Sequence, residues 1–520
     1  MLFNRHTLSM RNAAGAGLLL LALLFPAWQL DAAPAKGAKG AKAAAKAGAN
    51  VTATGERKKE FAPQYMEDIS KIVTFLREDP PNLTEALNAI NALIPKVADT
   101  ESYDIAWLSL QKGQAILMKA LAGDGNYTPA IAPLETALRL SEQHSYFDKT
   151  QNIGLLWMLT QLYAQEANLE KNPALQKQKY AKALDSMRRW ISLAPRANFD
   201  AYYFMAVILY QQATVDKEGQ GTADKELLRQ AEEAANHALL LATKPKDIEN
   251  TYQLLVGIGQ HRNDPVMMAR YLEILLQSNP KNSSWWDALF ASYHAAIEAT
   301  PEDSFLRNQA YAMAAYTIRR GQKHGFMMTP QHYFNLVAMY RLSGQHEAVV
   351  DILGEALRSG KIDPTDYQKW ELLADSYLQL GQIKSAIGVF KEAAQRFPKD
   401  GNIDMQIGSL YFNIPQHAPA LEFFLSATAK EIPERKALIL WNTIAYVYLY
   451  MKEYEKGLEA IDKALKINPE SKEALNIQRG LKDAIAERER MRAIDMIINK
   501  FQQSPQGQPA QQPAATQPAP

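Results

Sequence analysis

Residues 366–398 read DYQKWELLADSYLQLGQIKSAIGVFKEAAQRFP, and this stretch decides the fold. Trp370, Leu373 and Tyr377 recur at steps of three and four residues, which places them on one face of an α-helix. The next residue able to end that helix without strain is Gly381. The first half of the stretch therefore predicts an amphipathic helix with one apolar face.

The second half of the stretch predicts another amphipathic helix. Ala386 and Ala393 are small enough to let the two helices approach closely, while Phe390 fills the space beside them. Pro398 stops the second helix because it has no amide donor and disfavours helical geometry in the residue before it. A single pair of this kind leaves an apolar face uncovered, so we expect several pairs to stack on one another.

The same order of residues returns downstream, at a period of about 34 residues. It is seen at Trp441, Ile444, Ala445, Tyr448, Tyr454, Gly457, Ile461, Ala464 and Pro469. This pattern resembles the tetratricopeptide repeat (TPR) family. The resemblance implies an all-α, TPR-like α-solenoid, a right-handed superhelix that we expect to contain about ten helical pairs and a C-terminal capping helix.

The N-terminal residues follow the pattern of an export signal. Arg5 and Arg11 precede an apolar stretch at residues 13–28, and Ala32 and Ala33 offer cleavage positions. We therefore expect the protein to be exported, with the first segment either cleaved as a signal peptide or retained as an N-terminal anchor. No later stretch is long and apolar enough to span a bilayer, so we expect membrane contact only through this segment.

Composition and repeat regularity divide the chain into successive segments. They are a signal peptide or anchor (1–33), an Ala/Lys/Gly-rich flexible linker (34–57), a divergent TPR-like half (58–325), regular repeats (326–470), a charged capping helix (471–501) and a disordered Pro/Gln-rich tail (502–520). Two polar segments, near 164–179 and 213–224, are expected to be loop inserts. Such inserts are either contact sites for a partner or neutral extensions of the surface.

The composition argues against several function classes. A formal net charge of +1 provides no general attraction to nucleic acid, and the absence of cysteine excludes disulfides and thiolate metal sites. The nine histidines are scattered, without a metal-binding or catalytic spacing. We therefore expect no enzyme activity, no catalytic or metal-binding residues, no cofactor and no nucleic-acid partner.

In TPR proteins, the first helices of the pairs line a concave groove that receives an extended peptide or a helix. The resemblance therefore implies that a partner protein contacts residues one position away from the packing stripe. These are Phe204, Gln253, Asp287, Phe334, Glu371, Asp375, Met405, Asn442 and Tyr446. The set departs from the pattern of Lys and Asn residues that the family's carboxylate-clamp members have in these positions, so it favours a helix or a proline-containing strand as the ligand. The alternative is that several of these residues pack against an insert or an adjacent turn.

The arrangement of signal, tether, divergent half and regular half is similar to bacterial envelope TPR proteins associated with the TonB, ExbB and ExbD energy-transducing system. This resemblance implies a non-enzymatic periplasmic scaffold or adaptor that supports a cell-envelope transport complex. One alternative is an assembly factor for a secretion, outer-membrane biogenesis or cell-wall synthesis machine. Another is a glycan-binding accessory protein that uses exposed aromatic residues.

Overall fold

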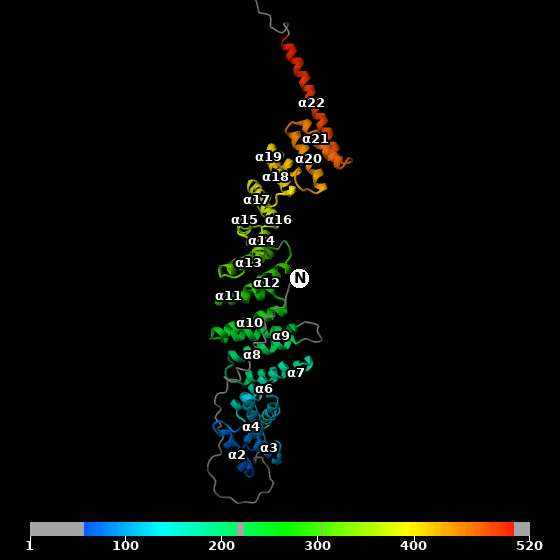
Figure 1. Ribbon diagram of the computed structural model, residues 1–520. Coiled ribbons are helices and arrows are strands. Elements are labelled where there is room, and N and C mark those ends of the chain that lie inside the picture. Colours follow the sequence, from blue (N-terminus) through cyan, green and yellow to red (C-terminus); the bar gives the residue numbers. More distant parts are fainter. Residues whose placement is uncertain (1–56, 216–222, 303, 504–520) are drawn as a thin grey trace, which may run out of the picture. The chain divides into compact units, whose positions relative to one another are not determined.

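The computed structural model describes residues 57–215, 223–302 and 304–503, which are mostly α-helical (Figure 1). The expected signal peptide, nearly all of the expected linker and most of the expected tail lie outside the described residues. The chain forms two compact units, Met1–Pro280 (unit 1) and Lys281–Pro520 (unit 2). The units divide between residues 280 and 281. The sequence analysis placed the boundary between divergent and regular repeats later, at residue 325.

Unit 1 consists of helices that pack in consecutive pairs, and each pair also packs against the next. The paired helices are α2 (Met66–Arg77) with α3 (Leu83–Leu93), α4 (Tyr103–Lys119) with α5 (Ile131–His144), α6 (Lys149–Leu169) with α7 (Pro173–Leu193), α8 (Phe199–Thr214) with α9 (Lys225–Leu241), and α10 (Pro245–Arg262) with α11 (Pro265–Ser278). Short helical turns accompany them: η1 (Pro63–Tyr65) precedes α2, η2 (Ile94–Lys96) lies between α3 and α4, and η3 (Ala120–Asp124) and η4 (Thr128–Ala130) lie between α4 and α5.

Unit 2 repeats this arrangement and ends in one long helix. Its pairs are α12 (Ser283–Ala299) with α13 (Phe305–Lys323), α14 (Pro330–Leu342) with α15 (His346–Arg358), α16 (Tyr367–Gln379) with α17 (Ile383–Arg396), α18 (Gly401–Asn413) with α19 (His417–Thr428), and α20 (Glu434–Tyr450) with α21 (Tyr454–Ile467), followed by α22 (Lys472–Gln503). The described residues thus contain ten consecutive pairs, which confirms the predicted all-α, TPR-like solenoid.

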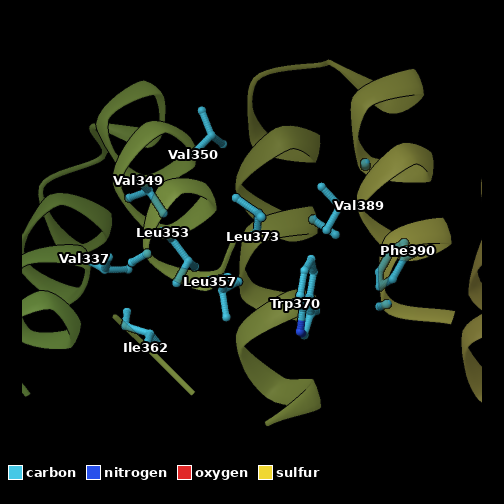
Figure 2. Close-up of a cluster of buried hydrophobic side chains, with 14 of the residues drawn as sticks. Val337, Val349, Val350, Leu353, Leu357, Ile362, Trp370, Leu373, Val389 and Phe390 are labelled. Atoms are coloured by element: carbon cyan, nitrogen blue, oxygen red, sulfur yellow. The ribbon is translucent and has the colours of Figure 1, made fainter. Parts of the chain in front are cut away.

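The apolar stripes predicted from the sequence form the core between the helices. Figure 2 shows Leu353 of α15 and Leu373 of α16 in one buried cluster with Trp370, Val389 and Phe390. Trp370 is fully buried. The cluster contains residues from successive pairs, so each pair covers the apolar face that its neighbour would otherwise expose.

The turn inside the 366–398 repeat is formed by the residues that the sequence indicated. The Asp366 side chain accepts a hydrogen bond from the backbone N–H of Gln368 and caps the N-terminus of α16. Gly381 has φ +71°, a left-handed conformation that glycine adopts without a steric penalty. These local signals therefore place both ends of α16 where the sequence predicts them.

The polar segment at 164–179 is not a loop insert, which corrects the sequence prediction. α6 continues to Leu169 and α7 begins at Pro173, so only residues 170–172 form the turn. The Asn172 side chain accepts hydrogen bonds from the N–H groups of Ala174 and Leu175 at the start of α7. The polar residues extend the exposed faces of two long helices and do not interrupt them.

The segment at 213–224 joins α8 to α9, and its residues 216–222 lie outside the described residues. At its ends, the backbone N–H of Asp224 donates to the carbonyl oxygen of Ala213 at 2.9 Å. The two ends of the connection are therefore held together, and an insertion between them leaves the pairing of α8 with α9 intact.

The C-terminal helix caps the solenoid through its first turns only. Ala474, Ile477 and Leu481 are buried against the core of α20 and α21. The helix then continues to Gln503, and residues 489–500 are all exposed. The predicted capping helix at 471–501 thus coincides with α22. Only the N-terminal part of this helix covers the last pair.

Candidate functional site

The first helices of unit 2 carry most of the residues that the sequence assigned to a groove. Asp287 lies on α12, Phe334 on α14, Glu371 and Asp375 on α16, and Met405 on α18. We call these five residues the first-helix row. Contacts between neighbouring first helices determine which members of the row lie together and which side chains remain able to bind a partner.

Two contacts join α12 to α14 and α14 to α16 through acidic members of the row. His332 Nε2 lies 3.3 Å from Asp287 Oδ1, and Arg341 Nη2 lies 4.0 Å from Asp375 Oδ2. The Asp287 side chain is 63% exposed, so its contact with His332 is open to water and to a competing partner. Each of these two acids therefore already has a side-chain neighbour on an adjacent first helix.

Phe334 is the apolar centre of the row. It is half-buried, and Lys369 Nζ of α16 lies 4.0 Å from the centre of its ring. An ammonium over an aromatic face is attracted by the electron-rich face of the ring. The contact joins α14 to α16 and places beside the aromatic ring an ammonium that also lies 3.5 Å from Asp366 Oδ2.

The row continues from α16 to α18 through hydrogen bonds. Gln406 Nε2 donates to Glu371 Oε1 at 3.0 Å, and the Tyr367 hydroxyl donates to Gln406 Oε1. Burial raises the pKa of Tyr367 well above its usual range, with nearby Glu371 adding to the effect, so the hydroxyl keeps its proton and acts as a donor. The side chain of Gln406 thus fixes α16 and α18 in register.

At α20 the structure changes the expected site. Asn442 is only 3% exposed, so its side chain does not line an accessible groove. It lies among the buried positions Leu440, Ile444 and Val447, because the long helix α20 is covered on more than one side. Met405 of α18 is half-buried and packs against the same cluster. Asn442 is therefore removed from the candidate surface, and Met405 is available only in part.

An apolar face of α20 extends the surface beyond the predicted residues. Ile439, Tyr446 and Tyr450 are 45%, 42% and 60% exposed, and their spacing of seven and four residues places them on one side of the helix. Only Tyr446 was in the predicted set. The other two could have been found by continuing its helical spacing in both directions along α20.

In unit 1, the two predicted residues have different surroundings. Phe204 of α8 lies 6.0 Å from the ring centre of Trp157 on α6, and Trp157 lies 5.3 Å from Trp190 on α7. Gln253 of α10 donates to Glu249 one turn earlier on its own helix. The sequence analysis missed Trp157, which lies six residues before Tyr163. It did so because it assigned a long loop to this repeat.

The buried carboxylates serve the fold. Asp404 is 2% exposed and binds Lys430 Nζ and Ser426 Oγ, each at 2.6 Å. Asp104 is 1% exposed and accepts a hydrogen bond from the Ala62 N–H at 3.1 Å. The described part of the chain has no group of three or more His, Asp or Glu side chains able to hold a metal ion. It also has no helix with the length and apolar character needed to cross a membrane.

Two stretches of the regular repeats match a known protein family. Residues 353–433 and residues 439–471 each match a family described as tetratricopeptide repeat. These two segments are similar to tetratricopeptide repeats. TPR segments bind protein partners, so the first-helix row of α16 and α18 and the apolar face of α20 lie in repeats suited to protein–protein interaction.

One curated relative is the BBSome complex member BBS4 homolog of Drosophila melanogaster, 24% identical over 161 residues. The match covers 28% of this chain and 32% of the relative, so the chain spans about a third of that protein.

Among solved structures, YrrB, a TPR protein with an unusual peptide-binding site, is 19% identical, with a TM-score of 0.28 over 41% of this chain and 99% of YrrB. MamA is 17% identical, with a TM-score of 0.24 over 35% of this chain and 96% of MamA. A TPR protein from Parabacteroides merdae ATCC 43184 is 14% identical, with a TM-score of 0.23 over 56% of this chain and 98% of that protein.

Proposed function

We propose that this protein is an exported, non-enzymatic scaffold of the bacterial cell envelope that holds a segment of a partner protein against unit 2. The binding surface consists of the first-helix row together with Ile439, Tyr446 and Tyr450 on α20. The observation that carries the proposal is the apolar face of α20, because exposed apolar side chains gathered on one face are typical of protein-binding surfaces.

The chemistry of the surface indicates the kind of segment it holds. Aromatic and aliphatic side chains on α20 provide anchors, and such anchors dominate the energy of protein interfaces. Along the row, Asp287 already contacts the imidazole of His332, and Asp375 already contacts the guanidinium of Arg341. A partner with apolar side chains and few charges fits this surface better than an acidic tail.

The proposed partner is a periplasmic domain of a TonB/ExbB/ExbD-type complex, which the scaffold would support without catalysing a reaction. This part of the proposal rests on the resemblance of the sequence to envelope TPR proteins and on the signal-like pattern of residues 1–33. An assembly factor for a secretion, outer-membrane or cell-wall machine, and a glycan-binding accessory protein, are the competing assignments.

The test is crosslinking in cells with the full chain as bait, followed by identification of captured proteins by mass spectrometry. The variant is Phe334→Glu, since its new carboxylate can pair with Lys369, whose ammonium lies over the Phe334 ring. The matched control is Tyr316→Glu on the second helix α13, where an exposed aromatic residue likewise lies beneath a cation, Arg320.

We expect energy-transducing proteins to be captured by the wild type and by Tyr316→Glu, and to be lost with Phe334→Glu. Capture of secretion or wall-synthesis proteins that is also lost with Phe334→Glu would support the proposed binding surface. It would favour an assembly factor as the function. Saturable glycan binding by the purified protein, without protein capture, would favour the second. Equal capture by both variants would show that the row is not the binding surface.

Export is tested separately. Cell fractionation and mass determination of the mature N-terminus should give a periplasmic protein that begins soon after residue 33 if the signal is cleaved, or an intact membrane-held chain if it is an anchor. A full-length chain in the cytoplasm would overturn the localisation and, with it, the assignment to an envelope complex.

A further inference from the structure

The far end of α22 is a helix without cover in the described structure of unit 2. Arg488, just before this end, joins α22 to α21, with its Nη1 3.2 Å from Glu455 Oε2. Figure 1 shows α22 continuing past α21, and residues 489–500 are all exposed. Exposed apolar side chains gathered on such a segment are suited to contact with a partner surface.

The exposed segment carries a concentrated apolar face. Met491, Ile494 and Ile498 are 51%, 47% and 47% exposed, and they follow one another at steps of three and four residues. Steps of three and four place them on one side of α22, at the a, d and a positions of a heptad repeat. Met496 and Ile497, which lie on other sides of the helix, are 63% and 56% exposed.

The charges beside this face complement a second copy of the same helix. With Met491 at position a, Arg490 occupies position g and Asp495 occupies the following position e. In a parallel two-helix coiled coil, a g residue of one helix lies beside the next e residue of the other. Arg490 therefore meets Asp495 of the second copy, twice by symmetry.

The alternative orientation lacks this match. An antiparallel pair places g beside g and e beside e, so Arg490 and Asp495 are no longer neighbours. Glu487 occupies the d position before Met491, and its Oε2 lies 3.6 Å from Arg490 Nη1 of its own helix. A charged residue at d weakens a coiled coil, so the apolar seam is short and the association depends on concentration.

We propose that two copies of this chain associate through the exposed part of α22 as a short parallel coiled coil, with Met491, Ile494 and Ile498 in the seam and Arg490 paired with Asp495. The dimer would carry two copies of the partner-binding surface, so a partner with two binding segments would be held more tightly. The dimer itself does not depend on the proposed scaffold function.

Cysteine crosslinking tests the geometry in the full chain, which contains no native cysteine. In Ile494→Cys, the two introduced thiols face each other at a d position of a parallel, in-register pair, so mild oxidation should give a disulfide-linked dimer. The control is Met496→Cys, which lies two residues away at the f position on the outside of the pair. Equal crosslinking of both variants, or none of Ile494→Cys, would overturn the proposal.

Sedimentation equilibrium tests the association without a crosslink. The wild type should show a concentration-dependent dimer, and Ile494→Asp together with Ile498→Asp should abolish it, while Met496→Asp retains it. Arg490→Asp and Asp495→Arg should each weaken the dimer by about tenfold, and the two changes together should restore it, because the pair is reversed. A monomeric wild type at every concentration, or no recovery in the charge-reversed double variant, would overturn the parallel dimer.

Discussion

Trp370 donates its indole N–H to the carbonyl oxygen of Pro364 at 2.9 Å, from a ring that is fully buried. The residue that marks the repeat in the sequence therefore does two things at once. Its ring fills the core between α15, α16 and α17, and its one polar atom fixes the turn that enters α16. Packing and loop geometry are coupled through a single side chain.

Replacement of the repeat tryptophans should have unequal effects. Trp370→Ala should lower the free energy of unfolding by about 3–5 kcal/mol, because it leaves a large cavity and an unpaired Pro364 carbonyl. Trp441→Ala should cost less, since Trp441 is half-buried with Lys463 Nζ 4.3 Å from its ring centre. Urea unfolding of the full chain followed by circular dichroism measures both. Equal losses would show that Trp441 is a core anchor of the same kind.

Two helical glycines of unit 2 should respond in opposite directions to alanine. A Cβ at Gly408 would lie 2.7 Å from the Phe424 ring, so Gly408→Ala should destabilise the chain by about 1–3 kcal/mol through overpacking. A Cβ at Gly388 meets nothing within 4 Å, so Gly388→Ala should stabilise α17 by about 0.5–1 kcal/mol. Thermal unfolding of the two variants compares them, and a stable Gly408→Ala would show that Phe424 can move aside.

Asp104 should make stability depend on pH. Burial raises the pKa of its carboxyl above the usual range, although the hydrogen bond from Ala62 N–H acts in the opposite direction. Because the folded-state pKa is raised, the wild type is most stable relative to Asp104→Asn below the unfolded pKa. It loses that advantage as pH rises through the folded pKa.

Asp104→Asn keeps an acceptor for the Ala62 N–H, whereas Asp104→Ala leaves that donor unpaired. We expect Asp104→Ala to cost about 1–3 kcal/mol at every pH, and Asp104→Asn to gain on the wild type above pH about 4. Denaturation at a series of pH values measures the difference. A gap between wild type and Asp104→Asn that does not change with pH would contradict the raised pKa.

Neighbouring residues on α20 should separate binding from folding. Tyr446→Ser and Ile439→Ser should change the free energy of unfolding by less than about 0.5 kcal/mol, since both side chains are well exposed. Leu440→Ala should cost about 2–5 kcal/mol, because Leu440 is 1% exposed. If the serine variants also lose capture of the partner, the face binds. A large loss of stability in Tyr446→Ser would instead make that face part of the core.

Much of the fold could be predicted from the sequence because the repeat fixes local geometry. The spacing of Trp370, Leu373 and Tyr377 predicted α16, and Gly381 predicted its end. The polar residues of 164–179 were misassigned because a long exposed helix face and a loop have similar compositions. In that case length and capping, which depend on Asn172 and Pro173, decide between the two.

The candidate surface could be predicted only in part, because exposure depends on neighbours distant in sequence. The helical spacing that selected Tyr446 also selected Asn442, four residues before it, although the packed helices bury the latter. The same spacing correctly placed Phe334 and Glu371 on adjacent first helices, but it could not reveal their contacts with Lys369 and Gln406. Those contacts arise from the stacking of α14, α16 and α18.

The sequence by itself determined that the regular repeats form paired helices, since apolar spacing, small residues and turn residues act within one repeat. The tertiary structure alone decided which side chains stay accessible. Stacking covers Asn442, leaves Tyr446 in water and lets α22 run beyond the last pair with Met491, Ile494 and Ile498 exposed. The physical reason is that the burial of a side chain depends on the helices packed around it. The residue pattern within one helix does not show which helices those are.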